Sequence, residues 1–115
     1  MIVRAETLSA QTMEKPRGGT GTAVRMAYEA ACGYKGEITN MAMMSLNPGS
    51  SIGYHQHVGD MELYLMLDGT AKTEDNGTED VLNAGDLMVT RNGEWHSLVN
   101  ESDSPVSFLA IIIKH

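Results

Sequence analysis

The sequence predicts an all-β protein, built as a sandwich or a barrel. Two observations carry this prediction. Gly and Asn turn signals recur every several residues, and the segments between them are short and rich in Val, Ile, Leu, Tyr and Met. In addition, no segment of normal helix length has an apolar stripe, so at most one helical turn is expected, near residues 9–13.

The turn signals divide the chain into nine expected strands. Asn76-Gly77 is the strongest hairpin signal, because both residue types tolerate the positive φ of a type I′ turn. An irregular arm over residues 1–21 is expected to precede the first strand. The expected strands lie near 22–28, 37–46, 52–57, 62–67, 70–74, 79–82, 86–90, 96–100 and 106–113.

The segment 106–113 is apolar on both faces. One interpretation is a buried central strand in a monomer. The other is that one side lines the barrel while the opposite side packs on a second layer or a subunit. The second interpretation, together with the apolar N-terminal strand, predicts a homodimer.

Composition limits the functions that the chain can have. Its 115 residues suit a single domain, 1–115, and 15 acidic against 8 basic residues give a net charge of −7. The basic residues are scattered, which argues against nucleic acid and anionic membranes as partners. The N-terminus has no signal-peptide character and no apolar run could span a membrane, so we expect a cytoplasmic protein. Cys32 is the only cysteine, which excludes an intrachain disulfide and favours a packing role.

A cluster of histidines stands out against this background. His55 and His57 are two residues apart on an expected strand, so they share a face with Cα atoms about 6.6–7 Å apart. If residues 58–61 form a turn, Glu62 lies opposite His57 on the returning strand, about 5 Å away at Cβ. His96 opens a later strand. Three imidazoles and one carboxylate would make a sound site for a divalent metal.

These residues resemble the first motif of the cupins, in which a glycine is followed by His-x-His, a glutamate and a second glycine at set spacings. Gly49, His55, His57, Glu62 and Gly69 occupy every set position of that motif. The resemblance therefore includes all three of the motif's metal-binding positions.

The second cupin motif is also recognisable. Gly85, Gly93, His96 and Asn100 fall at its spacing, whereas Arg91 stands where the family usually has proline. Because that proline shapes a turn, the departure concerns local loop geometry more than metal binding.

The two motifs and the stretch between them span residues 49–100. The resemblance to a small single-domain cupin implies a double-stranded β-helix, or jelly-roll barrel. It also implies that His55, His57, Glu62 and His96 are the ligands of one divalent transition metal at the centre of the barrel.

Four protein ligands leave an octahedral ion two open positions for a small molecule. The ion could be Mn, Fe, Ni or Zn. The ion and its ligands carry a charge of about +1, which favours an oxygen-rich ligand such as a carboxylate, keto acid, sugar acid or diketone. The first hypothesis is accordingly a small metalloenzyme for isomerisation, decarboxylation or dioxygenation. The alternative is a noncatalytic ligand-binding or sensor module, and a storage protein is least favoured.

No free general base is evident, so Tyr54, Tyr64 or a metal-bound hydroxide would have to serve in an enzyme. Arg25 and Arg91 could neutralise a substrate anion, although surface charge is the preferred interpretation of both. Trp95 is expected to pack outside the site, because neighbours on a strand face opposite ways.

Overall fold

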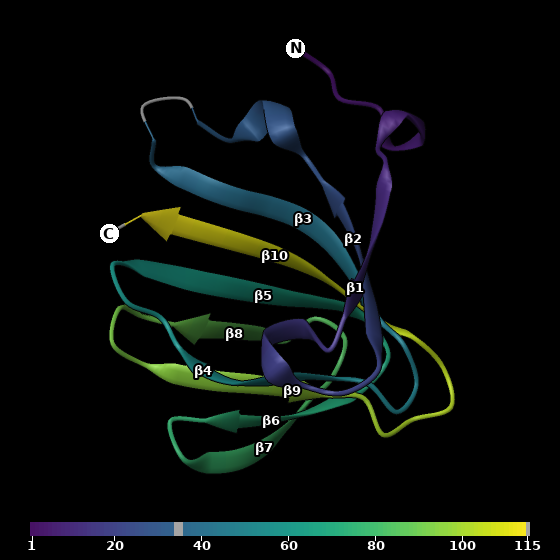
Figure 1. Ribbon diagram of the computed structural model, residues 1–115, viewed down its shortest axis with the longest axis vertical. Helices are drawn as coiled ribbons and strands as arrows, with labels where there is room; N and C mark the ends of the chain where they lie inside the picture. The colour runs from purple at the N-terminus through teal and green to yellow at the C-terminus, as the bar shows by residue number, and fades with distance from the viewer. Residues whose placement is uncertain (34–35, 115) are drawn as a thin grey trace.

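The computed structural model describes residues 1–33 and 36–114, which form two antiparallel sheets facing one another (Figure 1). The larger sheet has six strands in the order β1-β2-β3-β10-β5-β8, and the smaller sheet has four in the order β4-β9-β6-β7. The strand bounds are β1 Ala10–Glu14, β2 Thr22–Ala27, β3 Ile38–Leu46, β4 Ser51–Gln56, β5 Asp60–Asp68, β6 Ala71–Asp75, β7 Thr78–Leu82, β8 Leu87–Thr90, β9 Trp95–Val99 and β10 Val106–Lys114.

All nine strands expected from the sequence are present, with ends that differ by no more than two residues. The helical turn allowed near residues 9–13 is wrong, because this part of the arm forms β1. Its side chains are mostly exposed, so they lack the alternation that reveals a strand. Pairing with β2, from Ala10 opposite Met26 to Glu14 opposite Thr22, makes the segment an edge strand.

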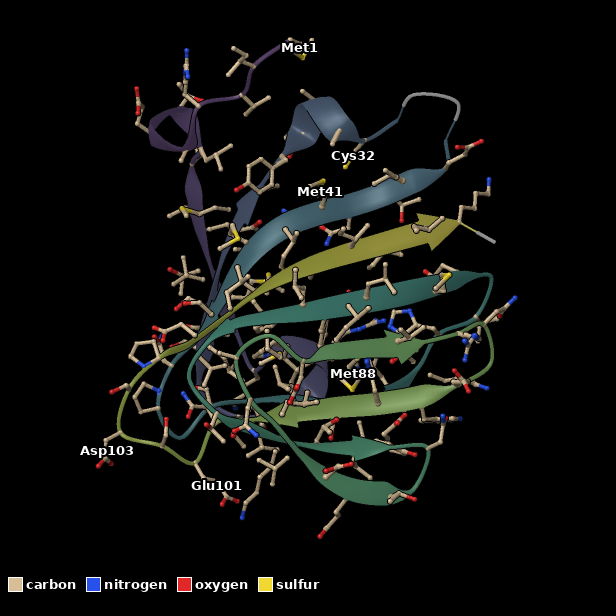
Figure 2. All side chains as sticks on the ribbon, turned by 180° about the vertical axis from the view of Figure 1, so that it is seen from behind. Met1, Cys32, Met41, Met88, Glu101 and Asp103 are labelled. Atoms are coloured by element: carbon tan, nitrogen blue, oxygen red, sulfur yellow. The ribbon has the colours of Figure 1, made fainter. Side chains whose placement is uncertain are left out.

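The apolar core fills the space between the sheets. β10 lies at the middle of the larger sheet, between β3 and β5, and its Val106 and Phe108 are fully buried. Leu46 lies beside Val106 in the larger sheet, and Leu98 belongs to the smaller sheet. Both are part of the buried apolar cluster, as is Met88, which is labelled in Figure 2. β10 is thus a central strand with one face in the core, while its alternate residues point outward and are only partly buried.

The hairpin predicted at Asn76-Gly77 is confirmed. The two residues have φ values of 49° and 87° and connect β6 to β7, which pair from Asp75 opposite Thr78 to Ala71 opposite Leu82.

A second expected hairpin, between His57 and Glu62, is wrong. β4 belongs to the smaller sheet, where it pairs with β9, whereas β5 belongs to the larger sheet, where it pairs with β8 and β10. The chain therefore crosses from one sheet to the other through residues 57–59. Spacing alone did not reveal this, because a turn and a crossover can have the same length.

The helices of the described segments are three single 3₁₀ turns, η1 Ala5–Thr7, η2 Pro16–Gly18 and η3 Glu29–Ala31. None of them has the length or the apolar character that crossing a membrane would require.

Candidate metal centre

Four ionisable side chains meet between the two sheets. His55 lies near the end of β4 and His57 follows that strand, while Glu62 lies on β5 and His96 on β9. His57, Glu62 and His96 are 2%, 5% and 1% exposed, and His55 is partly buried. The structure therefore brings together the four residues singled out in the sequence.

The polar atoms of the four residues converge on one point. The Nε2 atom of His96 lies 3.1 Å from Nε2 of His57, 3.2 Å from Nε2 of His55 and 3.2 Å from Oε1 of Glu62. Nε2 of His57 is 3.1 Å from the same Oε1. Two donors about 2.1 Å from one ion and at right angles are about 3.0 Å apart, so these separations suit neighbouring ligands of one metal ion. The cluster could therefore hold such an ion.

Hydrogen bonds on the far side of each ring determine which nitrogen faces the cluster. Nδ1 of His55 donates to the carbonyl oxygen of Gly53 at 2.6 Å, and Nδ1 of His57 donates to Oδ1 of Asp60 at 2.7 Å. In the neutral rings, the Nε2 atoms then carry lone pairs that point at one another. Lone pairs and a carboxylate at 3.1–3.2 Å repel unless a cation or protons lie among them.

His96 is held by a different kind of partner. Its Nδ1 lies 2.8 Å from Oγ1 of Thr90, a fully buried hydroxyl on β8. Each imidazole of the cluster thus has one partner outside the cluster that orients its ring, as is usual for metal-binding histidines.

The environment shifts the pKa values of His55 and His57 in opposite directions. Burial lowers the pKa of His55 from 6.5 to about 4, against the opposing effect of its bond to Gly53. The hydrogen bond to Glu62 raises the pKa of His57 above 6.5, and the bond to Asp60 adds to it, against the effect of burial. The protonated form of His57 is therefore favoured by its two carboxylate partners.

The acidic and phenolic groups of the site also have shifted pKa values. Burial would raise the pKa of Glu62, but hydrogen bonds with His57 and His96 outweigh it and lower the pKa to about 2. Burial and the charge of Glu62 raise the pKa of Tyr64 well above its usual 10. At neutral pH the carboxylate is therefore charged, and Tyr64 keeps its proton.

A cavity of about 170 Å³ adjoins the cluster. Arg17, from the arm, and Arg25 and Asn40, from β2 and β3, supply its other polar groups. The remaining lining is apolar apart from Tyr64, and consists of Met13, Pro16, Met44, Ile52, Ala110 and Ile112.

The candidate catalytic residues separate in the structure. Tyr64 is buried in the cavity wall, with its ring stacked on His96 at 4.9 Å between centroids. Tyr54 is 40% exposed and stacks on Trp95 at 5.3 Å, and neither residue lines the cavity. Trp95 thus packs outside the site, as the strand alternation predicted.

Among the two arginines considered from the sequence, Arg25 lines the cavity whereas Arg91 lies exposed in the turn before His96. Sequence reasoning missed Arg17, Asp60 and Thr90. Asp60 could have been found, because it follows His57 by only three residues and a carboxylate is a common partner of a metal-binding histidine. Nothing local marks Arg17 or Thr90, which reach the site only through the folding of the two sheets.

Comparison with known families identifies the class of protein. A cupin-domain family model matches residues 42–112 of the chain, which is more than half of its length. The chain therefore belongs to the cupin family, and its two sheets form the jelly roll that the motifs predicted.

Individual relatives narrow this placement. The chain is 38% identical to an oxalate-binding protein of Thermotoga maritima, over 98% of this chain and 93% of the relative. A crystal structure described as a predicted oxalate decarboxylase from Thermotoga maritima superposes with a TM-score of 0.92, at 34% identity over the full length of both chains. The chain is also 30% identical, over 76% of its length, to a gentisate 1,2-dioxygenase of Haloferax, but it spans only 26% of that protein.

Proposed function

We propose that this protein binds one divalent transition-metal ion through His55, His57, Glu62 and His96, and that the ion holds a small carboxylate in the adjoining cavity. The convergence of three Nε2 atoms and one carboxylate oxygen within 4.8 Å of one another carries the proposal. Because two of the three rings donate from Nδ1, their Nε2 lone pairs are free for an ion.

The donor set suits several metals. Imidazole nitrogen and carboxylate oxygen accept Mn, Fe, Ni and Zn, and the single cysteine lies elsewhere, so no thiolate selects among them. A divalent ion with three neutral imidazoles and one carboxylate carries a charge of about +1, which attracts an anion.

Oxalate is the first ligand to test. An oxalate-binding relative is 38% identical over nearly the whole chain, and four protein donors leave an octahedral ion room for two further oxygens. A cavity of about 170 Å³ holds the volume of roughly five to six water molecules, which suits a ligand of about six non-hydrogen atoms.

The test is calorimetric titration of oxalate into the protein before and after chelator treatment and reloading, in turn, with Mn²⁺, Fe²⁺, Ni²⁺ and Zn²⁺. We expect binding by the reloaded protein and none by the metal-free protein. Equal binding without metal would refute the role of the ion, and the absence of binding to any of the four reloaded metal forms would refute oxalate as the ligand.

Metal-dependent catalysis is the second candidate, covering decarboxylation, dioxygenation and isomerisation. Tyr64 favours it as a hydrogen-bond donor to a bound ligand, because burial keeps the phenol protonated at neutral pH, but its raised pKa makes it a poor general acid or base. Against catalysis, Glu62 is the only carboxylate that lines the described cavity, and it belongs to the proposed metal site. Formate and carbon dioxide released from oxalate by the Mn²⁺ form would establish turnover, whereas binding that saturates without product supports the ligand-binding role.

We also propose that the chain is a single domain that forms a homodimer through the outer face of its larger sheet. Leu65, Leu87 and Leu109 lie side by side on that face, and Leu65 and Leu87 are 36% and 52% exposed. Light scattering should report a dimer for the natural protein and a monomer for Leu65→Glu. Val81→Glu, at an exposed apolar position of the smaller sheet, is the matched control and should stay dimeric. A natural protein that stays monomeric at all concentrations would contradict the proposed dimer. The cytoplasmic location and the lack of nucleic-acid and membrane partners stay predictions from the sequence.

A further inference from the structure

Arg25 is held in the cavity wall by neutral groups. Its Nε and Nη2 atoms donate to Oδ1 of Asn40 at 3.1 and 2.6 Å, and its Nη1 donates to Oε1 of Gln11 at 3.2 Å. Within the described residues, no carboxylate forms an ion pair with it. The guanidinium is therefore oriented but not neutralised, and two of its five N–H groups have no partner among the described residues.

Arg17 reaches the same cavity from a strained segment. Its backbone has a φ of 52° and a ψ of 37°, and Lys15 has a φ of 45°, so two non-glycine residues of the short η2 segment adopt the left-handed region. Such conformations cost free energy and are found mainly where surrounding structure imposes them for function.

The surrounding structure that imposes this conformation is β4. A Cβ at Gly53 would overlap the carbonyl oxygen of Arg17, and a Cβ at Gly19 would overlap that of Ser51, so only glycines allow so close an approach. Thr20 and Ser51 exchange backbone hydrogen bonds of 3.2 and 2.8 Å beside this contact. In Figure 1 this segment is the purple coil beside β4. Arg17 is thus fastened to the strand that carries His55.

The two arginines give the cavity a positive side that the metal cluster does not account for. The chain has a net charge of −7, yet this cavity contains two guanidinium groups and one carboxylate. A ligand that binds the ion at one end would have its other end among these arginines. Arginine binds planar carboxylates well, because its N–H groups match the spacing of the two oxygens.

We infer that Arg17 and Arg25 bind the end of the ligand that points away from the metal ion, so that the site selects a short dicarboxylate over a monocarboxylate. This inference rests on the proposed function. It assigns selectivity to two residues outside the metal cluster, one on β2 and one on the arm.

The test compares two ligands, oxalate and glycolate, in calorimetric titrations of the Mn²⁺ form. Both can chelate a metal ion through two oxygens, but glycolate lacks the second carboxylate. We expect Arg25→Gln to weaken oxalate binding about 10- to 100-fold and glycolate binding less, because a chelated oxalate directs two carboxylate oxygens away from the ion whereas a chelated glycolate directs only one. Arg91→Gln is the matched control, since it removes the same charge from an exposed turn and should leave both affinities unchanged.

Arg17→Gly separates a binding role from a structural one. Glycine accepts a φ of 52° without strain, so the variant should melt at the same temperature or higher. Its oxalate affinity should nevertheless fall about 2- to 5-fold, the size of an exposed charge contact. Its manganese content should not fall, because the removed charge repels the ion.

Each outcome decides one of the two proposals. If the natural Mn²⁺ protein binds oxalate and both arginine variants bind it as Arg91→Gln does, the inference is wrong and the proposed function stands. If none of the four metal forms of the natural protein binds either ligand, both fall. Should Arg25→Gln not fold, Arg25→Lys, which keeps the charge but not the planar fork, and Arg17→Gly still decide the question.

Discussion

Two hollows of this protein lie on opposite faces of the same strand, β9. His96 faces inward to the metal cluster, whereas its neighbours Ser97 and Val99 line a groove on the outer face of the smaller sheet. The groove is the larger of the two, at about 360 Å³ against about 170 Å³.

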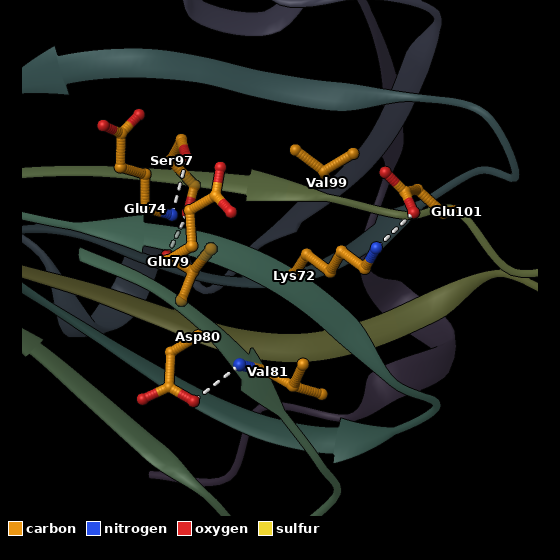
Figure 3. A pocket seen from close by; sticks show the side chains of 9 residues that line it. Lys72, Glu74, Glu79, Asp80, Val81, Ser97, Val99 and Glu101 are labelled. Carbon is orange, nitrogen blue, oxygen red and sulfur yellow. Dashed lines mark hydrogen bonds and ion pairs between the residues drawn. The ribbon is translucent and has the colours of Figure 1, made fainter. Parts of the chain in front are cut away.

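The groove is acidic, in keeping with the net charge of −7. Figure 3 shows Glu74, Glu79, Asp80 and Glu101 around a single cation, Lys72, which pairs with Glu101 at 2.7 Å. These carboxylates do not converge: within residues 1–33 and 36–114, the histidine cluster is the only group of three or more potential ligands close enough to share an ion. A metal site is therefore distinguished by the convergence of its donor atoms, rather than by the size of a hollow or the density of charge.

The largest expected effect comes from removing a ligand. His57→Ala should lower manganese affinity more than about 100-fold, because even the loss of a partner behind a ligand costs about 10- to 100-fold. The protein should stay folded, since the barrel is held mainly by apolar packing. Metal analysis and circular dichroism measure the two quantities, and full metal occupancy in this variant would refute the assignment.

The partner behind His57 should have the next largest effect. Asp60→Asn keeps the size of the side chain but weakens the bond that orients the ring at 2.7 Å, so we expect manganese affinity to fall about 10- to 100-fold. Asp80→Asn makes the same change in the groove and should leave manganese affinity unchanged. Equal affinities of the two variants, measured by competition with a chelator, would show that Asp60 does not support the site.

Acid should weaken metal binding by the histidine cluster. Hydrogen bonding to Glu62 raises the pKa of His57 above 6.5, so a metal ion must displace a proton from this ring when the pH is below that raised pKa. Metal affinity should therefore increase with pH up to that raised pKa. Because a bound metal keeps His57 deprotonated, the stabilisation it provides is greatest at high pH and is lost as the pH falls.

This effect can be measured as the difference in melting temperature with and without Mn²⁺ between pH 8 and pH 5. We expect the difference to narrow steadily in acid. His55, whose pKa burial lowers to about 4, should add little until the lower end of this range. A difference that stays constant or widens in acid would mean that these histidines do not bind the ion.

The smallest effects are expected in the groove. Lys72→Ala removes an ion pair whose side chains are both 60% exposed, and such exposed pairs contribute little to stability. Urea denaturation should therefore detect little change, and oxalate binding should not change at all. A marked loss of oxalate binding in this variant would overturn the distinction between the two hollows.

The sequence by itself determined the strands and the four residues of the cluster. Turn residues and alternating apolar positions act locally, so nine strands could be located without knowledge of their partners. The four residues were found from motif spacing, and the ring positions of Trp95 and His96 followed from strand alternation.

Only the tertiary structure decided how these elements meet. The contact between His57 and Glu62 was expected from a hairpin, but it arises from two strands in different sheets that face each other across the core. β1 was not recognised, since an exposed edge strand has no apolar alternation and depends on its neighbour for its form. Arg17 lies 38 residues before His55, and Thr90, although only six residues before His96, belongs to the opposite sheet, so both contacts are set by the packing of whole sheets, which no local pattern in the sequence encodes.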